Sequence, residues 1–482
     1  MTHRRDAAAR HALVFGTDGY DGAKDTQRRR SVDVRLAAED HHQTRRGRKK
    51  LVANARDLRR NFPDAAWAIR MNAEMIAAYD FRAKTDDEGL NRELEQYIAH
   101  KSEPAQFDAA GRLSRQQAAR LVETCRSVDG DVWPLKRNTG ALQFIEGDRV
   151  AIPAGSSLPR IDDLGEYRHG VRIDRDGRPV RVAVCDREGA TLKLRRVLDA
   201  RFFWQVGYFD RVDQTRGVSP IAAALNAFRD ASESRELALA KAKVAQYLAL
   251  VLKRSATEPL GDATQTEGDR SATSIDLGAG PQFVDLDIDE DIDFKTADVP
   301  GDSFLEFQRH VIASAILSLD IPRSFWDETQ GVFHGNRAAV LRYVRTTRCK
   351  REPMHRWHRE WSLWQLGVGV RDRELSLGRR DFRDIARAMR WHWLGLQWWD
   401  LAKDTDGYLK LIAACLMDPE EVALEVGNAD IYDIIASRAR VEKAASEAGV
   451  ALSYQASNTQ ATLGTADKAD VDAEGNAETD DE

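Results

Sequence analysis

Five aspartates recur at every second position near the middle of the sequence, at Asp285, Asp287, Asp289, Asp291 and Asp293. Carboxylates at this density can hold calcium, but an EF-hand loop also needs a central glycine and a terminal glutamate, which this run lacks. Val284, Leu286 and Ile288 alternate with the acids. The alternation predicts a strand with one buried face and one solvated, acidic face. We therefore interpret the run as structural.

Two histidines, His355 and His358, lie three residues apart in a stretch with helical periodicity, where both side chains can share one face. Such a pair can supply two metal ligands. A zinc protease motif also carries a glutamate between its histidines, and the sequence places no third ligand here. The ordinary interpretation is that these histidines pair with neighbouring arginine and glutamate side chains. A metal-dependent nuclease that combines the aspartate run with either histidine stays open as an alternative.

Other sequence signatures of catalysis are missing. The sequence has no Walker A motif, no G-x-G-x-x-G and no G-x-S-x-G. Its cysteines are scattered and form no C-x-x-C pair, at Cys125, Cys185, Cys349 and Cys415. This spacing does not favour structural zinc or a disulfide framework. We expect no catalytic residue, no cofactor, no metal, and neither nuclease nor ATPase activity.

Composition sets the class of protein. A chain of 482 residues is too long for one simple core, so two or more lobes are expected. Apolar residues make up 42% and charged residues 31%, which is typical of a folded protein, and the net charge is −6. That charge does not favour tight nucleic-acid binding. No apolar run reaches the length of a membrane span, and the N-terminus does not have the pattern of a secretory signal.

Two helices and an insert between them organise the sequence from Gln214 to Pro322. The first helix is expected to start at Ser219, as the N-cap, with Pro220 in the first turn, and to run to about Lys253. The second is expected over Ser303–Leu319, where Ser303 and Glu306 can form a capping box. Its apolar residues recur at helical spacing and predict one buried stripe, formed by Phe304, Phe307, Val311, Ile312, Ala315, Ile316 and Leu319.

The first part of the chain combines a basic arm with helices and strands. Residues 1–45 are rich in arginine and are interpreted as a flexible arm, either solvated or touching nucleic acid. Helices are expected over 46–62, 64–80 and 114–127. Short strands are expected at 131–133, 142–145, 150–152 and 201–209. The clearest hairpin spans Gly170–Val184, with Asp176 and Gly177 at its turn.

The last part of the chain is mainly helical. A polar loop is expected over 323–336, followed by a long helical stretch rich in arginine and tryptophan over 337–366. A tryptophan cluster, interpreted as core or interface, consists of Trp391, Trp393, Trp398 and Trp399. Small helices are expected at 402–415, 418–426 and 430–448. The acidic segment 456–482 is expected to be a disordered tail.

These pieces occur in an order that resembles a known family. The series is "RNFPDAAWAIRMNAEMI", "HGVRIDRDGRPVRVAV", "QTRGVSP", "GPQFVDLDIDEDIDF", a helix ending "LDIP", and "NRAAVLRYVR". Over roughly 45–450 the sequence resembles the lambda-like portal proteins of tailed bacteriophages. Two local details depart from that family. Gly335-Asn336 precede Arg337 where paired serines are usual, and Leu401 follows Asp400 where a proline is usual.

The resemblance implies an α+β portal fold and divides the chain. It implies a basic N-terminal arm (1–45), a mixed α/β wing (46–218) and a small α/β clip (254–300). The stem helices would be 219–253 and 301–322. A tunnel loop (323–336) would precede a long helix that returns to the wing (337–399). A helical crown (400–455) and the tail (456–482) would complete the chain.

The resemblance also implies partners and a place of action. Family members form a ring, typically of twelve, at one capsid vertex, where they nucleate procapsid assembly and pass double-stranded DNA during packaging and ejection. The implied partners are the terminase large subunit, the major capsid protein and scaffold, and the head–tail adaptor, with no membrane. The implied location is the virion, and the host cytoplasm during assembly. A non-enzymatic adaptor or scaffolding protein stays open as a further alternative.

Two sets of residues are candidates for contacts in such a ring. The loop would project into the channel and touch DNA weakly, through Arg323, Gln330, His334, Asn336 and Arg337, with glycines at 331 and 335 permitting movement. The acidic clip strand, with Asp285, Asp287, Asp289 and Asp291, would contact a partner and pair with a neighbouring subunit, because a lone strand leaves backbone groups unpaired. Twelve copies at −6 each would give the ring about −72, which disfavours adhesion of DNA.

Overall fold

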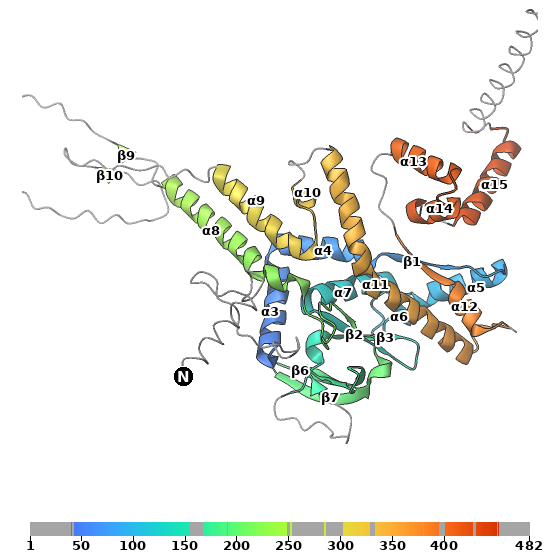
Figure 1. The fold of residues 1–482 in the computed structure, drawn as a ribbon, viewed down its shortest axis with the longest axis horizontal. Coiled ribbons are helices and arrows are strands. Elements are labelled where there is room, and N and C mark those ends of the chain that lie inside the picture. The colour runs from blue at the N-terminus through green and yellow to red at the C-terminus, as the bar shows by residue number, and fades with distance from the viewer. Residues whose placement is uncertain are drawn as a thin grey trace, which may run out of the picture.

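A helix pair, a central body and a group of C-terminal helices follow one another across the structure, a computed structural model (Figure 1). The helix pair leaves the body on one side, and the C-terminal helices lie toward the other. The fold mixes helices with small antiparallel sheets, in agreement with the predicted α+β class. The structure describes residues 40, 43–153, 167–189, 191–247, 251–252, 284–285, 302–327, 333–378, 380–394, 401–427, 430–450 and 452.

The N-terminal helices confirm the sequence expectations to within a few residues. Helix α3 (Arg45–Asn61) starts at Thr44, whose hydroxyl accepts from the Gly47 amide, and α4 (Pro63–Ala77) begins with a proline in its first turn. Helix α7 (Arg115–Asp129) has a complete capping box between Ser114 and Gln117. Between these helices the chain forms α5 (Glu88–Lys101) and the short α6 (Pro104–Phe107).

Two small sheets follow α7. The first has the order β3-β2-β8, formed by β2 (Asp131–Lys136), β3 (Leu142–Glu146) and β8 (Val206–Gly207). The second is a meander of β4 (Tyr167–Arg168), β5 (Val171–Ile173), β6 (Pro179–Glu188) and β7 (Thr191–Asp199). The β5–β6 hairpin confirms the prediction, and Gly177 at its turn has φ +80°.

Two predicted strands are confirmed only in part. Residues 201–209 begin in a 3₁₀ turn (Ala200–Phe202), stabilised by an Asp199 side chain that accepts from the Arg201 amide, and only Val206–Gly207 form a strand. Residues 150–152 make only an isolated bridge, from Val150 to Val184, after the 3₁₀ turn Gly147–Arg149. Local turn chemistry outweighed the β propensity of these short apolar runs.

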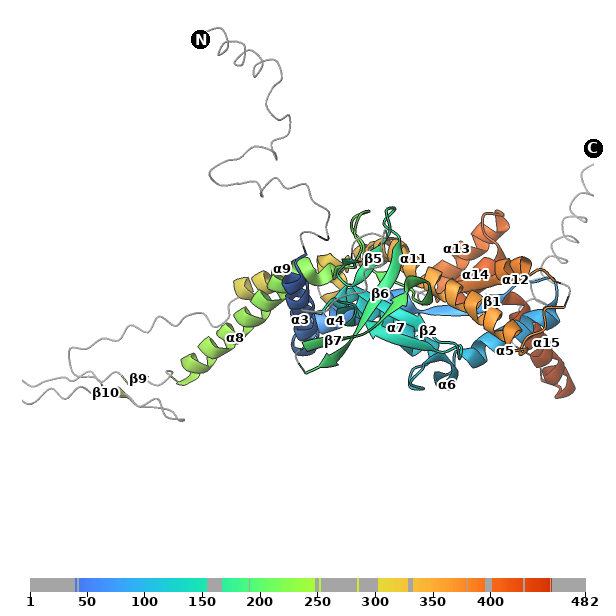
Figure 2. The ribbon, with the colours of Figure 1, turned by 90° about the horizontal axis from the view of Figure 1, so that it is seen from below.

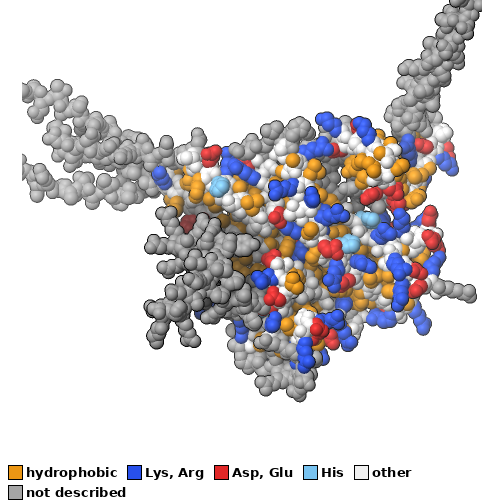
Figure 3. Space-filling view, viewed as in Figure 1, with side chains coloured by type: hydrophobic (Ala, Val, Ile, Leu, Met, Phe, Trp, Pro, Cys, Tyr) orange, Lys and Arg blue, Asp and Glu red, His pale blue; other side chains and the backbone are white. Residues whose placement is uncertain are grey.

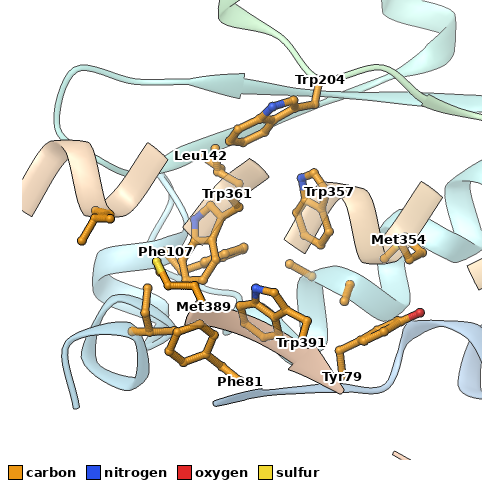
Figure 4. Packing of buried hydrophobic residues seen from close by; sticks show 14 of the residues in the cluster. Tyr79, Phe81, Phe107, Leu142, Trp204, Met354, Trp357, Trp361, Met389 and Trp391 are labelled. Atoms are coloured by element: carbon orange, nitrogen blue, oxygen red, sulfur yellow. The ribbon is translucent and has the colours of Figure 1, made fainter. Parts of the chain in front are cut away.

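The longest helix, α11 (Phe333–Arg371), has 39 residues and includes Pro353. It packs against β1 (Tyr79–Ala83) and β11 (Met389–Trp393), which pair antiparallel. Figure 4 shows the aromatic core between these elements, with Trp357 and Trp361 of α11 beside Phe107 and Trp391. The interpretation of Trp391 as core is confirmed, whereas Trp398 and Trp399 lie outside the described residues.

The helix pair consists of α8 (Leu225–Tyr247) and α9 (Asp302–Ile316), which run side by side (Figures 1 and 2). A 3₁₀ turn, Pro220–Ala224, precedes α8, and another, Leu317–Leu319, follows α9. The expected cap at Ser219 is absent, because its hydroxyl donates to the Ser127 carbonyl instead, at 2.7 Å. A second buried cluster anchors the base of the pair to α3 and α4.

The described residues of the C-terminal part contain four further helices. They are α12 (Phe382–Ala388), α13 (Leu401–Ala413), α14 (Pro419–Gly427) and α15 (Ile431–Glu447), and the last three confirm the predicted small helices. A single helical turn, α10 (Arg323–Trp326), follows the helix pair. Within the described part of the chain, no helix is both long enough and apolar enough to cross a membrane.

Candidate functional site

One buried arginine holds the junction between the body and the helix pair. Arg216, from the "QTRGVSP" motif, is fully buried, and its Nε and Nη2 donate to both carboxylate oxygens of Asp131, at 2.6 and 2.8 Å. The guanidinium also donates to three backbone carbonyls, those of Gly147, Val150 and His169. One side chain therefore ties the segment before α8 to the start of β2, the turn after β3 and the β4–β5 corner.

The partner of this arginine is held in its charged form. Burial alone raises the pKa of Asp131, but the charges of Arg216 and Arg48, together with hydrogen bonds, outweigh burial and lower it. Arg48 of α3 donates to Asp131 at 3.2 Å and to the Gly217 carbonyl at 2.8 Å. Burial, aided by the charge of Arg216, lowers the pKa of Arg48 to about 10. The basic cluster at 45–50 thus directs Arg48 into the protein, not toward nucleic acid.

Two glycines allow the chain segments to meet at this junction. A Cβ atom at Gly217 would lie 2.0 Å from the Gly130 carbonyl oxygen, and one at Gly130 would lie 2.4 Å from that of Gly217. Gly130 also has φ +92°, a conformation that favours glycine. The motif around Arg216 stands out in the sequence, whereas its partner Asp131 was predicted only as part of a strand. No spacing rule connects two residues from such distant parts of the chain.

Three carboxylates beside the junction have a spacing that resembles a metal site. Oxygen atoms of Asp129, Glu146 and Asp148 lie within 4.8 Å of one another. Arg56 donates to all three, at 2.5, 2.8 and 2.9 Å, and Arg187 binds Glu146 and Asp148. Burial raises the pKa of Asp129 against the opposing effect of Arg56, whereas the two arginines outweigh burial and lower the pKa of Asp148. Because two guanidinium groups already neutralise the acids, the cluster is a salt-bridge network.

The helix pair leaves apolar side chains uncovered away from its base. Ile312, Ala315, Ile316 and Leu319 are buried, as the predicted stripe requires. Farther from the body, Gln308 of α9 donates to Ser234 of α8. Beyond this contact, apolar side chains of the pair are exposed. The exposed fractions are 64% for Leu237, 56% for Leu239, 50% for Leu305 and 57% for Phe307. The expected burial of Phe307 is therefore wrong within a single chain, because neither α8 nor the body covers it.

The predicted tunnel loop is shorter than expected. Arg323 lies in α10 and Asn336 in α11, which leaves 327–332 between the two helices. Gly335 is helical because continuity with α11 outweighs the cost of one glycine, about 1 kcal/mol. Arg337 pairs with Asp404 of α13 at 2.7 Å, while Arg323 is exposed. Gln330 and the side chain of His334 lie outside the described residues.

The described part of the aspartate run has a partner in its own chain. Strand β10 (Val284–Asp285) pairs parallel with β9 (Val251–Leu252). The premise that this strand is alone, and so needs a neighbouring subunit, is thus wrong at these two residues. Its partner β9 belongs to the segment that follows α8. Asp287, Asp289, Asp291 and Asp293 lie outside the described residues.

Neither histidine lies near the described part of the aspartate run, Val284–Asp285. His358 is fully buried, with ring centroids 4.8 Å from those of Trp357 and Trp391. Burial, with the nearby charge of Arg115, keeps its pKa well below the ordinary value. The expected pairing of His358 with arginine and glutamate is wrong, because aromatic rings enclose it. In both views β10 lies beyond the outer end of α8, whereas α11 crosses the body (Figures 1 and 2).

The chain is similar to proteins of known structure. The chain is similar to a solved chain from the "Virion of native gene transfer agent (GTA) particle", at 15% identity and a TM-score of 0.40, over 78% of this chain and 93% of that one. It is also similar to chains in the neck of the empty particle and of the native particle, both at 15% identity, with TM-scores of 0.41 and 0.40. These cover 78% and 79% of this chain and 93% of each of those chains.

Sequence comparison is more informative. No curated protein matches the chain. Residues 27–328 match the profile of a family described as "Phage portal protein, lambda family". The match spans more than half of the chain and includes the Arg216 junction and both helices of the pair. The chain therefore belongs to the lambda family of phage portal proteins.

Proposed function

We propose that this portal protein forms a ring of twelve copies at one vertex of a phage capsid, through which double-stranded DNA passes during packaging and ejection. Membership of the family establishes the role as portal and head–tail connector. The observation that carries the ring is the uncovered apolar surface of α8 and α9, at Leu237, Leu239, Leu305 and Phe307. Helices with apolar residues that find no cover in their own chain gain stability by packing against another copy. A contact of this kind, repeated by rotation, closes into a ring.

The observed elements support the division of the chain into portal parts. The projecting pair would be the stem (219–253 and 301–322), to which α8 and α9 belong, and the insert between its helices (254–300) the clip. The helices and sheets of 46–218, completed by α11 and β11 within 337–399, would be the wing. The last three helices fit a crown over 400–455. The arm (1–45) and the tail (456–482) lie almost wholly outside the described residues.

The segment between α10 and α11 is the proposed channel loop. Its ends are fixed, because Arg309 of α9 pairs with Asp327 at 3.1 Å and Arg337 pairs with Asp404. Arg323 is exposed at its base, so one cation per subunit is positioned to touch phosphate. Weak contacts of this kind, repeated around a ring, would guide DNA without holding it.

The remaining assignments concern partners and location. We assign the terminase large subunit to the clip, the major capsid protein and scaffold to the wing, and the head–tail adaptor to the exit of the ring. The protein would act in the virion and, during assembly, in the host cytoplasm. A purely mechanical role is supported by the neutralised carboxylates around Arg56 and by the enclosure of His358 in aromatic core.

The ring is tested by substituting one exposed phenylalanine of the stem. Phe307→Glu would place a charge in the proposed interface, while Phe382→Glu makes the same change at a similarly exposed residue of α12. Light scattering should give a mass about twelve times that of one chain for the wild type and for Phe382→Glu. Phe307→Glu should give mainly single chains with unchanged circular dichroism. Rings of normal mass and appearance in Phe307→Glu would contradict the proposed stem interface.

A further inference from the structure

A cleft of about 930 Å³ separates the C-terminal helices from the body. On the body side it is lined by α11 and by the β1–β11 pair, and on the other side by the N-terminal ends of α14 and α15. Acidic, basic and histidine side chains gather where these two parts meet, as Figure 3 shows. The distribution of charge between the two sides is uneven.

The body side of the cleft is basic. Arg82 and Arg390 face each other directly across the β1–β11 pair, where like charges destabilise a sheet. Arg345 and Arg348, one turn apart on α11, are exposed and line the same cleft. Among the described residues, no carboxylate lies within ion-pair distance of Arg345, Arg348 or Arg390, whereas Arg82 lies 3.5 Å from Asp80 and 4.0 Å from Glu95. One acid, Glu352 of α11, lines the cleft on this side. This basic face therefore lacks most of its neutralising charge.

A buried guanidinium adds to the imbalance. Arg351 is 7% exposed, and it donates to the Met75 carbonyl and to the Thr347 hydroxyl, both uncharged acceptors. Its guanidinium lies 3.3 Å from the centroid of the Trp393 ring. Burial lowers the pKa of Arg351 to about 10, which is still well above neutrality. A positive charge held in this way is stabilised by negative charge across the cleft.

The opposite side of the cleft is acidic. It carries Asp418, Glu420, Glu421 and Asp430. Asp418 and Asp430 accept from backbone amides at the starts of α14 and α15, which keeps their carboxylates at the cleft. In the described part of the chain, one ion pair joins the acidic rim to the body: Lys84 donates to both oxygens of Glu420, at 2.7 and 2.8 Å.

We propose that the C-terminal helices α13–α15 form a movable unit that is latched onto the body by these opposite charges. Two ion pairs already join the unit to the body, Lys84–Glu420 and Arg337–Asp404, and the other acids of the rim are the counter-charges for Arg345, Arg348 and Arg390. Each exposed pair is weak and is screened by salt, so the latch is reversible. The latch is a property of the single chain, and so it stands or falls independently of the proposed ring.

Native cysteines allow the latch to be tested in the full-length protein. Cys349 of α11 and Cys415, between α13 and α14, are exposed, whereas Cys185 is buried and burial raises the pKa of Cys125 to about 12. Spin labels on the two exposed thiols report one distance by pulsed electron paramagnetic resonance, with labelled chains diluted into unlabelled ones. We expect a single narrow distance at low salt, and a broader distribution with longer distances at high salt.

Charge variants separate the latch from general effects of salt. Glu420→Lys should give the broad distribution already at low salt, and the swap Lys84→Glu/Glu420→Lys should restore the narrow one. Glu442→Lys, which removes the partner of Arg438 on α15, should behave as wild type. If Glu420→Lys fails to fold, the swap decides the matter. The proposal is overturned if salt leaves the distance unchanged, or if a folded swap variant stays open.

Discussion

At the scale of single residues, the buried pair Arg216–Asp131 illustrates how a polar group can fix a fold. Taking two charges out of water costs several kcal/mol per ion, which attraction offsets only when every donor and acceptor is satisfied. Here Arg216 makes five hydrogen bonds, and Asp131 also accepts from Arg48 and from the Gly217 amide. The pair therefore specifies where the helix pair leaves the body, and the loss of one partner leaves a buried charge.

Arg216→Ala is expected to lower the free energy of unfolding by about 3–5 kcal/mol, the cost of breaking a buried pair from one side. Arg216→Lys should lose much of the same stability, because an ammonium group cannot reproduce the fork to Asp131 and the carbonyls. Urea unfolding followed by circular dichroism measures the difference. Arg201→Ala, at an exposed arginine, is the control and should change stability little. A stable Arg216→Ala variant would show that the junction is held by packing alone.

His358 predicts how stability depends on pH. Its pKa is depressed in the folded protein by burial and by the charges of Arg115 and His355, whereas an unfolded histidine titrates near pH 6.5. Above that pH neither state binds the proton. Below it the unfolded state binds the proton first, so this residue destabilises the fold progressively as pH falls from about 6.5.

Thermal unfolding between pH 7.5 and 5.5 should therefore show a loss of stability that is smaller in His358→Gln than in the wild type. His310→Gln, at an exposed histidine of α9, should keep the wild-type slope. Equal slopes in all three proteins would remove His358 as the cause.

At the scale of elements, the sequence predicted those whose signals are local. The helices α3, α4, α7, α13, α14 and α15 were predicted to within a few residues. Side-chain caps begin α3 and α7, and a proline lies in the first turn of α4. Errors arose where a distant contact, local turn chemistry or the continuity of a helix decided the outcome. The Ser219 hydroxyl binds Ser127 instead of capping α8, and helix continuity absorbs Gly335 into α11. The Arg216–Asp131 junction was unpredictable for the same reason, since its two halves lie far apart in the chain.

The channel loop is tested by Gln330→Ala/His334→Ala, with Gly335→Ala as a matched comparison. If the loop contacts DNA, the double variant should assemble normal rings but package shorter or poorly retained DNA. Gly335 lies in a helix with open space around its Cβ position, so Gly335→Ala should be tolerated. Packaged DNA length, measured by gel electrophoresis after particle purification, distinguishes them. Full-length packaging by the double variant would remove the loop from the mechanism, and a defect in Gly335→Ala would show that this glycine must leave the helix.

At the scale of the whole molecule, a conduit must bind its partners without binding its cargo tightly. The chain carries a net charge of −6, and the charges of its buried arginines are used inside the protein, as Arg216, Arg56 and Arg126 illustrate. DNA affinity grows with each phosphate that a protein neutralises. We therefore propose that pairing of the buried arginines within the protein favours transit of DNA, and that docking depends on separate surfaces such as the insert between α8 and α9.

Removing the insert between α8 and α9 tests whether partner docking depends on a surface separate from the one that forms the ring. Helices α8 and α9 run side by side, so the end of α8 and the start of α9, which flank the insert, lie at the same end of the helix pair. Deleting 256–298 should leave a foldable chain that still forms rings, because the apolar surface around Phe307 remains. The deletion should abolish capture of the terminase large subunit in a pull-down from solution.

A second variant tests whether the acidic run itself makes the contact. Changing Asp285, Asp287, Asp289 and Asp291 to Asn should weaken capture without removing the insert. Normal capture by the deletion would place terminase docking elsewhere on the ring, whereas loss of rings would show that the insert also holds neighbouring subunits together.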